Sequence, residues 1–119
     1  MSLADHQCIP CQGGVPPLDA DTAEKLLKQL GAGWQLTHQN TRLYKQFKFK
    51  NFKKALAYVN AVGDVAEEQG HHPNFHFTWG EVELEIWTHK IGGLTESDFY
   101  LAAKANRIFD ENFVVKKSA

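Results

Sequence analysis

Apolar and polar residues alternate one for one on both sides of Gly80, over residues 75–79 and 82–86. A period of two residues is typical of a β-strand that buries one face, so this segment predicts a β-hairpin with its turn at Gly80. We expect one face of the hairpin to pack on helices and the other to be more polar. The apolar residues of the predicted packed face are Phe75, Phe77, Trp79, Val82, Leu84 and Ile86.

Three other segments repeat apolar residues every three or four positions, which is the spacing of a helix with one apolar face. Each begins at a residue whose side chain can cap a helix, and the first two end at glycines, which suit helix C-termini. The predicted boundaries are Asp19 or Asp21 to Gly31, Asn51 to Gly70, and Thr95 onward.

Two short strands around the polar turn "HQNT" complete the pattern, over residues 34–37 and 42–49. The order of elements is then α-β-β-α-β-β-α. Two hairpins separated by a helix predict an α+β fold, a four-stranded antiparallel sheet with helices packed on one face. Residues 1–18 carry glycines and prolines, so we expect an irregular N-terminal arm followed by a single domain over residues 19–119.

The apolar stripe of the last predicted helix is wider than contact with one sheet requires. A second packing surface would use the excess, so the stripe predicts a homo-oligomer. Its residues are Phe99, Leu101, Ala102, Ala105, Ile108 and Phe109.

Composition narrows the classes of function. The formal net charge is −1, which does not indicate a strongly basic nucleic-acid-binding protein. Six basic residues alternate with aromatic side chains over residues 42–54, but a strand with solvated lysines explains this pattern and is the interpretation we favour. No apolar run approaches the roughly 20 residues of a membrane helix, and the start of the chain lacks signal-peptide features. We therefore expect a cytoplasmic protein that binds neither nucleic acid nor membrane.

The two cysteines form the motif "CIPC", Cys8 to Cys11. A redox motif of this kind opens a helix after a strand, whereas glycines and prolines follow here. His6 with the two cysteines would give a partial zinc site, for which no fourth ligand is evident. We favour loop cysteines, and the function of the motif stays open.

Histidines gather around the predicted hairpin, where four of the six fall within residues 71–89. His71 and His72 precede its first strand, and His89 follows its second strand. Because the two open ends of an antiparallel hairpin lie side by side, we expect these three residues to converge.

Such a cluster has three possible uses. Adjacent histidines on an extended backbone point to opposite faces, and no cysteine or HExxH motif joins them, which disfavours zinc. Histidines at helix ends often bond free carbonyl groups, which would be a structural role. Imidazole also titrates near neutral pH and can act as acid and base without metal or organic cofactor. With no Gly-rich phosphate loop or GxSxG motif present, we favour proton chemistry such as elimination, hydration or isomerisation.

Two carboxylates stand near these histidines in the predicted fold. Glu67 lies one helical turn before His71 and could orient it, or could be solvated beside Glu68. Asp98 follows Thr95 by three residues and can complete a capping box with it. From the start of that helix, Asp98 could also face His89.

The stretches "EEQGHHPNF" and "WTHKIGGLTESDFYLA" together resemble the pterin-4a-carbinolamine dehydratase family, and the resemblance extends over residues 18–113. The family pattern is E-x-x-x-H-H-P followed, after a hairpin, by T-H and G-L-T-x-x-D. The resemblance implies dehydration of 4a-hydroxytetrahydropterins to quinonoid dihydropterins, which recycles the cofactor of aromatic amino acid hydroxylases. It also implies tetramers formed through helices, and some members partner a transcription factor. The matching residues are Glu67, His71, His72, Pro73, Thr88, His89, Gly93, Leu94, Thr95 and Asp98.

The resemblance also implies roles for individual residues. His71 and His89 would be the two acid/base residues that act at the 4a-hydroxyl and the ring N5–H, with their individual roles left open, while His72 would bind the pterin and assist. Pro73 would shape the pocket, with Glu67 and Asp98 supporting the histidines. Trp87 stands where a small residue is common in the family. The residues expected to hold the pterin ring are Gly70, His71, His72, Trp87, Thr88, His89 and Lys90.

Overall fold

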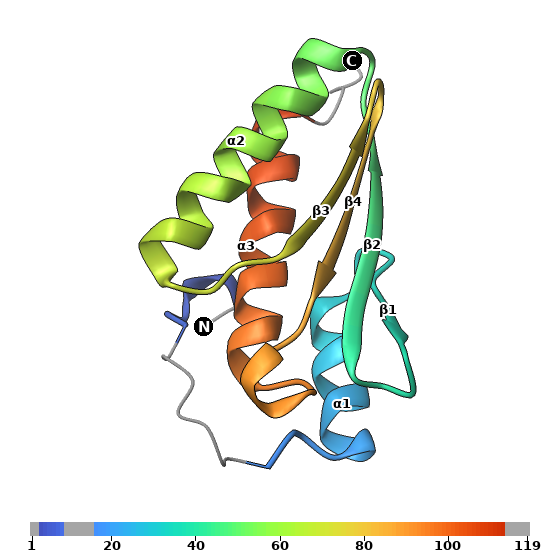
Figure 1. The fold of residues 1–119 in the computed structure, drawn as a ribbon, viewed down its shortest axis with the longest axis vertical. Coiled ribbons are helices and arrows are strands. Elements are labelled where there is room, and N and C mark those ends of the chain that lie inside the picture. Colours follow the sequence, from blue (N-terminus) through green and yellow to red (C-terminus); the bar gives the residue numbers. More distant parts are fainter. Residues whose placement is uncertain (1–2, 9–15, 114–119) are drawn as a thin grey trace.

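The computed structural model describes residues 3–8 and 16–113. Within these residues it contains three α-helices and one four-stranded antiparallel sheet in the spatial order β1-β2-β4-β3 (Figure 1). The predicted α+β fold and its α-β-β-α-β-β-α order are confirmed. The elements are η1 (Leu3–Asp5, a 3-10 turn), α1 (Ala20–Leu30), β1 (Gln35–Thr37), β2 (Arg42–Lys48), α2 (Phe52–Gln69), β3 (Asn74–Thr78), β4 (Glu81–Ile86), η2 (His89–Ile91, a second 3-10 turn) and α3 (Glu96–Asn112).

Local sequence explains where the helices begin and end. The Asp19 side chain accepts a hydrogen bond from the Thr22 backbone N–H, so Asp19 caps α1. Asn51 caps α2 in the same way. Gly70 ends α2 in the left-handed conformation, with φ of 65°, which glycine adopts at little cost. The chain leaves the helix there and turns toward β3.

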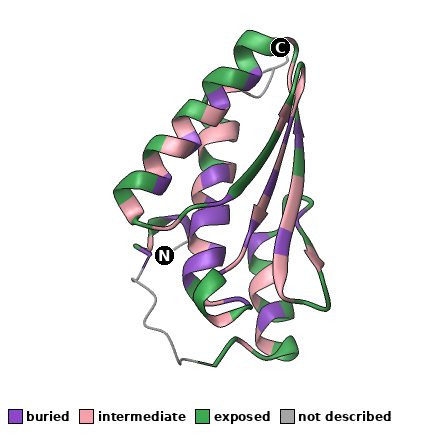
Figure 2. Cartoon of the chain, viewed as in Figure 1, coloured by how far each residue is buried: buried purple, intermediate pink, exposed green. Residues whose placement is uncertain are grey.

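The core lies between the helices and one face of the sheet (Figure 2). On β4 the apolar residues Val82, Leu84 and Ile86 are fully buried, whereas the glutamates between them remain partly exposed. Helix α3 occupies the centre and contacts α1, α2, η1 and β2. The burial pattern therefore matches the alternation that predicted β4.

The apolar stripe of α3 does not supply the free surface that the sequence suggested. Phe99, Leu101, Ala102 and Ala105 are buried, and the rest of the stripe packs against the same core. The stripe is wide because several elements of the same chain surround this helix. Large apolar side chains that do remain exposed lie on α2, on β3 and in the β3–β4 turn: Phe52, Leu56, Phe75 and Trp79.

The prediction for the hairpin is correct for β4 and wrong in part for β3. Phe75 is 36% exposed and Trp79 is 66% exposed, while Phe77 is only partly buried. The physical reason is the strand order, because β3 is an edge strand and β4 lies between two strands. Phe77 still packs on the core and stacks on Phe52 of α2 at 5.0 Å between ring centroids.

Candidate active site

A cavity of about 320 Å³ lies where the α2–β3 connection meets the end of β4. In the antiparallel pairing of β3 and β4, Asn74 lies opposite Glu85, so the segments that flank the hairpin lie next to each other. The predicted convergence of the histidines therefore occurs. The cavity is lined by Gly70, His71, His72, Trp87, Thr88, His89 and Lys90.

His71 contacts a buried carboxylate. Its Nε2 atom lies 2.5 Å from Oδ1 of Asp98, whose side chain is fully buried. Oδ2 of Asp98 accepts hydrogen bonds from the Thr88 hydroxyl at 2.9 Å and from the Thr95 backbone N–H at 2.8 Å. Since each of the other polar neighbours offers a proton, the carboxylate acts as an acceptor, and we assign the shared proton to Nε2 of His71. Nδ1 is then the proton acceptor of this imidazole.

Asp98 thus has both of the roles considered for it, with one correction. It completes the capping box at Thr95. The histidine it contacts is His71, not His89. The chain explains the difference: Thr88 is buried and its side chain reaches Asp98, whereas the next residue along, His89, is exposed.

Thr88 was expected only among the pterin-holding residues, and its bond to Asp98 was not foreseen. Its backbone N–H also donates to the Gly93 carbonyl at 2.9 Å, which closes the loop around η2. At Gly93 a β-carbon would lie 2.6 Å from the Pro17 side chain, so glycine is required for this close approach. The sequence did contain a signal for this contact. The alternation of β4, continued by two residues beyond Ile86, predicts that the Thr88 side chain faces inward.

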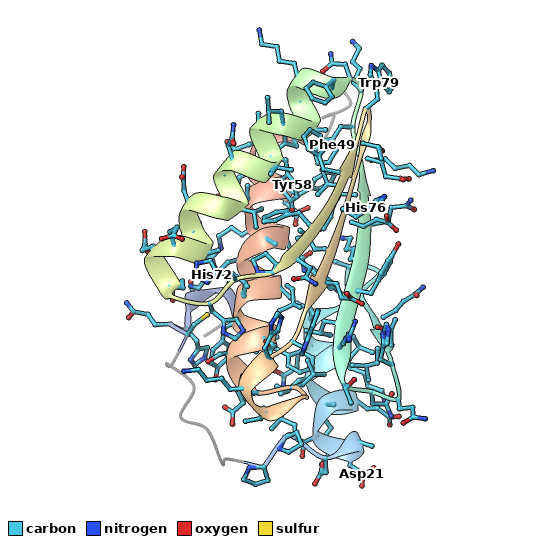
Figure 3. All side chains as sticks on the ribbon, viewed as in Figure 1. Asp21, Phe49, Tyr58, His72, His76 and Trp79 are labelled. Atoms are coloured by element: carbon cyan, nitrogen blue, oxygen red, sulfur yellow. The ribbon has the colours of Figure 1, made fainter. Side chains whose placement is uncertain are left out.

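Glu67 contacts a different histidine from the one expected. Its Oε1 atom lies 3.0 Å from Nε2 of His72, and the two side chains are 82% and 57% exposed. Of the two possibilities considered for Glu67, orientation of His71 is not observed, because the helical spacing that would pair them ends at Gly70, and the largely exposed carboxylate agrees with the other possibility, a solvated side chain. Figure 3 shows His72 beside the C-terminal end of α2.

His89 stacks on an aromatic ring. The His89 and Trp87 ring centroids are 4.2 Å apart with an interplanar angle of 24°. The guanidinium carbon of Arg42 lies 3.9 Å from the centroid of the same Trp87 ring, and Arg42 also forms an ion pair with Glu85 at 3.2 Å.

The remaining predicted residues lie at the edge of the site or outside it. Pro73 is buried and lines a neighbouring cavity of about 390 Å³ that also reaches His72. Lys90 is exposed at the cavity rim. Trp34 lies in the core and donates its Nε1–H to Asn106 at 2.7 Å.

Cys8 lies close behind the site. Its backbone N–H donates to Oε1 of Gln69 at 2.8 Å, and its thiol contacts the Ser97 carbonyl at 3.5 Å. Burial raises the pKa of the Cys8 thiol to about 11. Cys11 lies outside the described residues, so the predictions for the "CIPC" motif as a whole stay open.

Residues 3–8 and 16–113 contain no group of three or more histidine, cysteine, aspartate or glutamate side chains placed to hold one metal ion. None of the helices among these residues is long and apolar enough to cross a bilayer.

Comparison with known proteins gives the family. The chain belongs to the pterin 4 alpha carbinolamine dehydratase family, whose family model matches residues 16–108. A relative from Rubrobacter xylanophilus is 51% identical over 106 residues, which cover 89% of this chain and 97% of the relative. A relative from Rickettsia canadensis is 52% identical over 102 residues, covering 86% and 93%. Both carry the provisional name pterin-4-alpha-carbinolamine dehydratase.

A solved structure agrees with this assignment. The crystal structure of a transcriptional coactivator/pterin dehydratase from Brucella melitensis has a TM-score of 0.73 and 30% sequence identity, over 77% of this chain and 97% of that chain. The resemblance found in the sequence motifs is therefore confirmed.

Proposed function

We propose that this protein dehydrates a 4a-hydroxytetrahydropterin to the quinonoid dihydropterin and water by histidine acid–base catalysis. The observation that carries the proposal is the placement of His71 and His89 on one cavity, with His71 bonded to the buried Asp98. A cavity of about 320 Å³ is of the size that encloses small ligands. Membership of the family supports a pterin as the substrate.

The reaction needs two proton transfers and no oxidant. The bond between C4a and the hydroxyl oxygen breaks, and the oxygen leaves as water after it gains a proton. The proton on N5 is removed, and its electron pair forms the double bond between N5 and C4a. General acid–base catalysis of such steps typically contributes about 10²–10⁴-fold in rate.

The two histidines suit different halves of this reaction. Because Asp98 engages Nε2 of His71, Nδ1 of His71 is available to accept the N5 proton. His89 approaches from the other strand of the hairpin and would donate a proton to the leaving hydroxyl. His72 would bind the pterin, with Glu67 in contact, and Pro73 would shape the wall beside it. The backbone around Gly70, Trp87, Thr88 and Lys90 would complete the binding of the ring.

The biological setting follows from the same proposal. Quinonoid dihydropterin is the form from which a tetrahydropterin is regenerated, so the enzyme would recycle the cofactor of an aromatic amino acid hydroxylase in the cytoplasm. We further propose a homo-oligomer, formed through the exposed apolar side chains of α2 and β3 in place of the buried face of α3.

A stopped-flow dehydration assay tests the proposal. We expect His71→Ala and His89→Ala each to slow dehydration by at least about tenfold, a fraction of the whole acid–base contribution. The double variant should approach the uncatalysed rate. His76→Ala is the matched control, since His76 lies in the same hairpin, is 70% exposed and does not line the cavity (Figure 3). Equal rates in the wild type and all variants would contradict the proposal.

A further inference from the structure

The three cavity histidines differ in what holds their rings. His71 is bonded to Asp98, and His72 is bonded to Glu67. Within the described part of the chain, no hydrogen bond or ion pair to the His89 ring is found, and its close partner is the Trp87 ring. Stacking is therefore the interaction that can fix the His89 imidazole.

The Trp87 ring has a neighbour on each face. The Arg42 guanidinium carbon lies 3.9 Å from its centroid and the His89 ring centroid lies 4.2 Å from it. Two planar groups that close to one ring centre would overlap if they shared a face, so they lie on opposite faces. Both faces of the indole are then occupied by the protein itself, and only its edge is left for a ligand in the cavity.

The sheet register places these residues together. Leu43 of β2 lies opposite Ile86 of β4, so the same register continued by one residue sets Arg42 opposite Trp87. Both side chains leave the sheet on the face away from the helices, because their neighbours Leu43 and Ile86 are buried. The ion pair of Arg42 with Glu85 further restricts the guanidinium.

We infer that Trp87 and Arg42 are positioning residues for His89: the indole holds the imidazole at the cavity and does not stack on the pterin. This inference rests on the proposed role of His89 as the acid. A cation over one face and an aromatic ring over the other are both favourable contacts for an indole. These contacts therefore restrict the orientations of the Arg42 guanidinium, the Trp87 indole and the His89 imidazole together. Removing the indole leaves His89 in the chain but frees its ring.

Steady-state and stopped-flow kinetics of Trp87→Ala, Trp87→Phe and Arg42→Ala provide the test. We expect Trp87→Ala to lower kcat by about tenfold with KM changed by less than about threefold, since misplacement of a catalytic group affects the chemical step. Trp87→Phe keeps an aromatic face and should recover most of the rate. Arg42→Ala should have a smaller effect that disappears in the Trp87→Ala background. Lys45→Ala, which removes a cation from the Phe47 ring in the same strand, is the matched control.

The opposite kinetic result overturns the inference. If Trp87→Ala raises KM and leaves kcat unchanged, the indole binds the pterin and does not position His89. NMR of the ligand-free protein separates this failure from failure of the proposed function. Ring-current-shifted His89 signals that move in Trp87→Ala would support the stack even if the wild type has no dehydratase activity. Signals that do not move would refute it.

Discussion

Nε2 of His71 and Oδ1 of Asp98 lie 2.5 Å apart, and the carboxylate is completely enclosed by the protein. Asp98 also accepts from Thr88 and Thr95, so a single side chain joins the end of β4, the start of α3 and the α2–β3 connection. A buried carboxylate that accepts several hydrogen bonds stabilises the fold and also fixes the geometry of the site.

Asp98→Asn should therefore reduce both activity and stability. The amide keeps the shape but brings donors toward Thr88, Thr95 and His71, and it can leave His71 in the other tautomer. We expect dehydration to slow by at least about tenfold and the free energy of unfolding to fall by about 1–3 kcal/mol. Stopped-flow assays and urea unfolding measure the two effects.

Combining Asp98→Asn with His71→Ala shows whether Asp98 affects the dehydration rate through His71 or by another route. In a His71→Ala background, Asp98→Asn should slow dehydration little further, because the residue through which it acts is gone. A full additional loss of rate would show that Asp98 acts on the reaction by another route.

Glu67→Gln should be mild by comparison. The carboxylate is 82% exposed and its partner His72 is 57% exposed. Exposed ion pairs contribute little because water and salt screen them, so we expect the free energy of unfolding to change by less than about 0.5 kcal/mol. The same urea titration used for Asp98→Asn measures it, and a loss as large as that of Asp98→Asn would show that the two carboxylates are not distinguished by burial.

Much of the fold was predictable because the signals are local. Asn51 and Gly70 bound α2 through their own side-chain and backbone preferences, and the alternation around Leu84 sets the inward face of β4. The exposure of β3 was not predictable in this way. Phe75 and Leu84 belong to equally regular patterns, and only the strand order, which depends on long-range pairing, leaves Phe75 at the edge.

The sequence was enough to predict which segments come together at the site, but not which side chains contact one another there. Hairpin geometry is enough to bring His71 near His89. Which carboxylate contacts which histidine depends on how the chain turns at Gly70 and on which side chains face inward at the end of β4. Those directions depend on tertiary packing, so the sequence offered His71 to Glu67 and His89 to Asp98 as possible partners, whereas the structure pairs Glu67 with His72 and Asp98 with His71.

The Cys8 thiol should react slowly in the folded protein. Burial raises its pKa from 9.0 to about 11, and the thiolate is the reactive form. At pH 8 this shift alone lowers the thiolate fraction by about 100-fold. In a Cys11→Ser variant, a chromogenic disulfide reagent should modify Cys8 much faster in urea than in buffer. Equal rates in both conditions would contradict the burial of the thiol.

The same shift predicts a dependence of stability on alkaline pH. Between pH 9 and about 11 the folded chain keeps the Cys8 proton while the unfolded chain loses it. The unfolded state therefore binds fewer protons, and the free energy of unfolding should decrease as pH rises through this window. Cys8→Ser lacks the titrating group, so urea unfolding of the two proteins from pH 8 to 10.5 should show a steeper decrease in the wild type.

The exposed apolar side chains of α2 and the hairpin lead to the last prediction. Phe52 is 47% exposed and Trp79 is 66% exposed, and β3 beside them has an open backbone edge. Surfaces of this kind are typical of contacts between protein chains. We expect the wild type to be a homo-oligomer by size-exclusion chromatography with light scattering, and Phe52→Glu with Trp79→Glu to be monomeric. Gln29→Glu, which also adds a negative charge at an exposed position but on α1, should leave the mass unchanged. A monomeric wild type would refute this assignment of the surface.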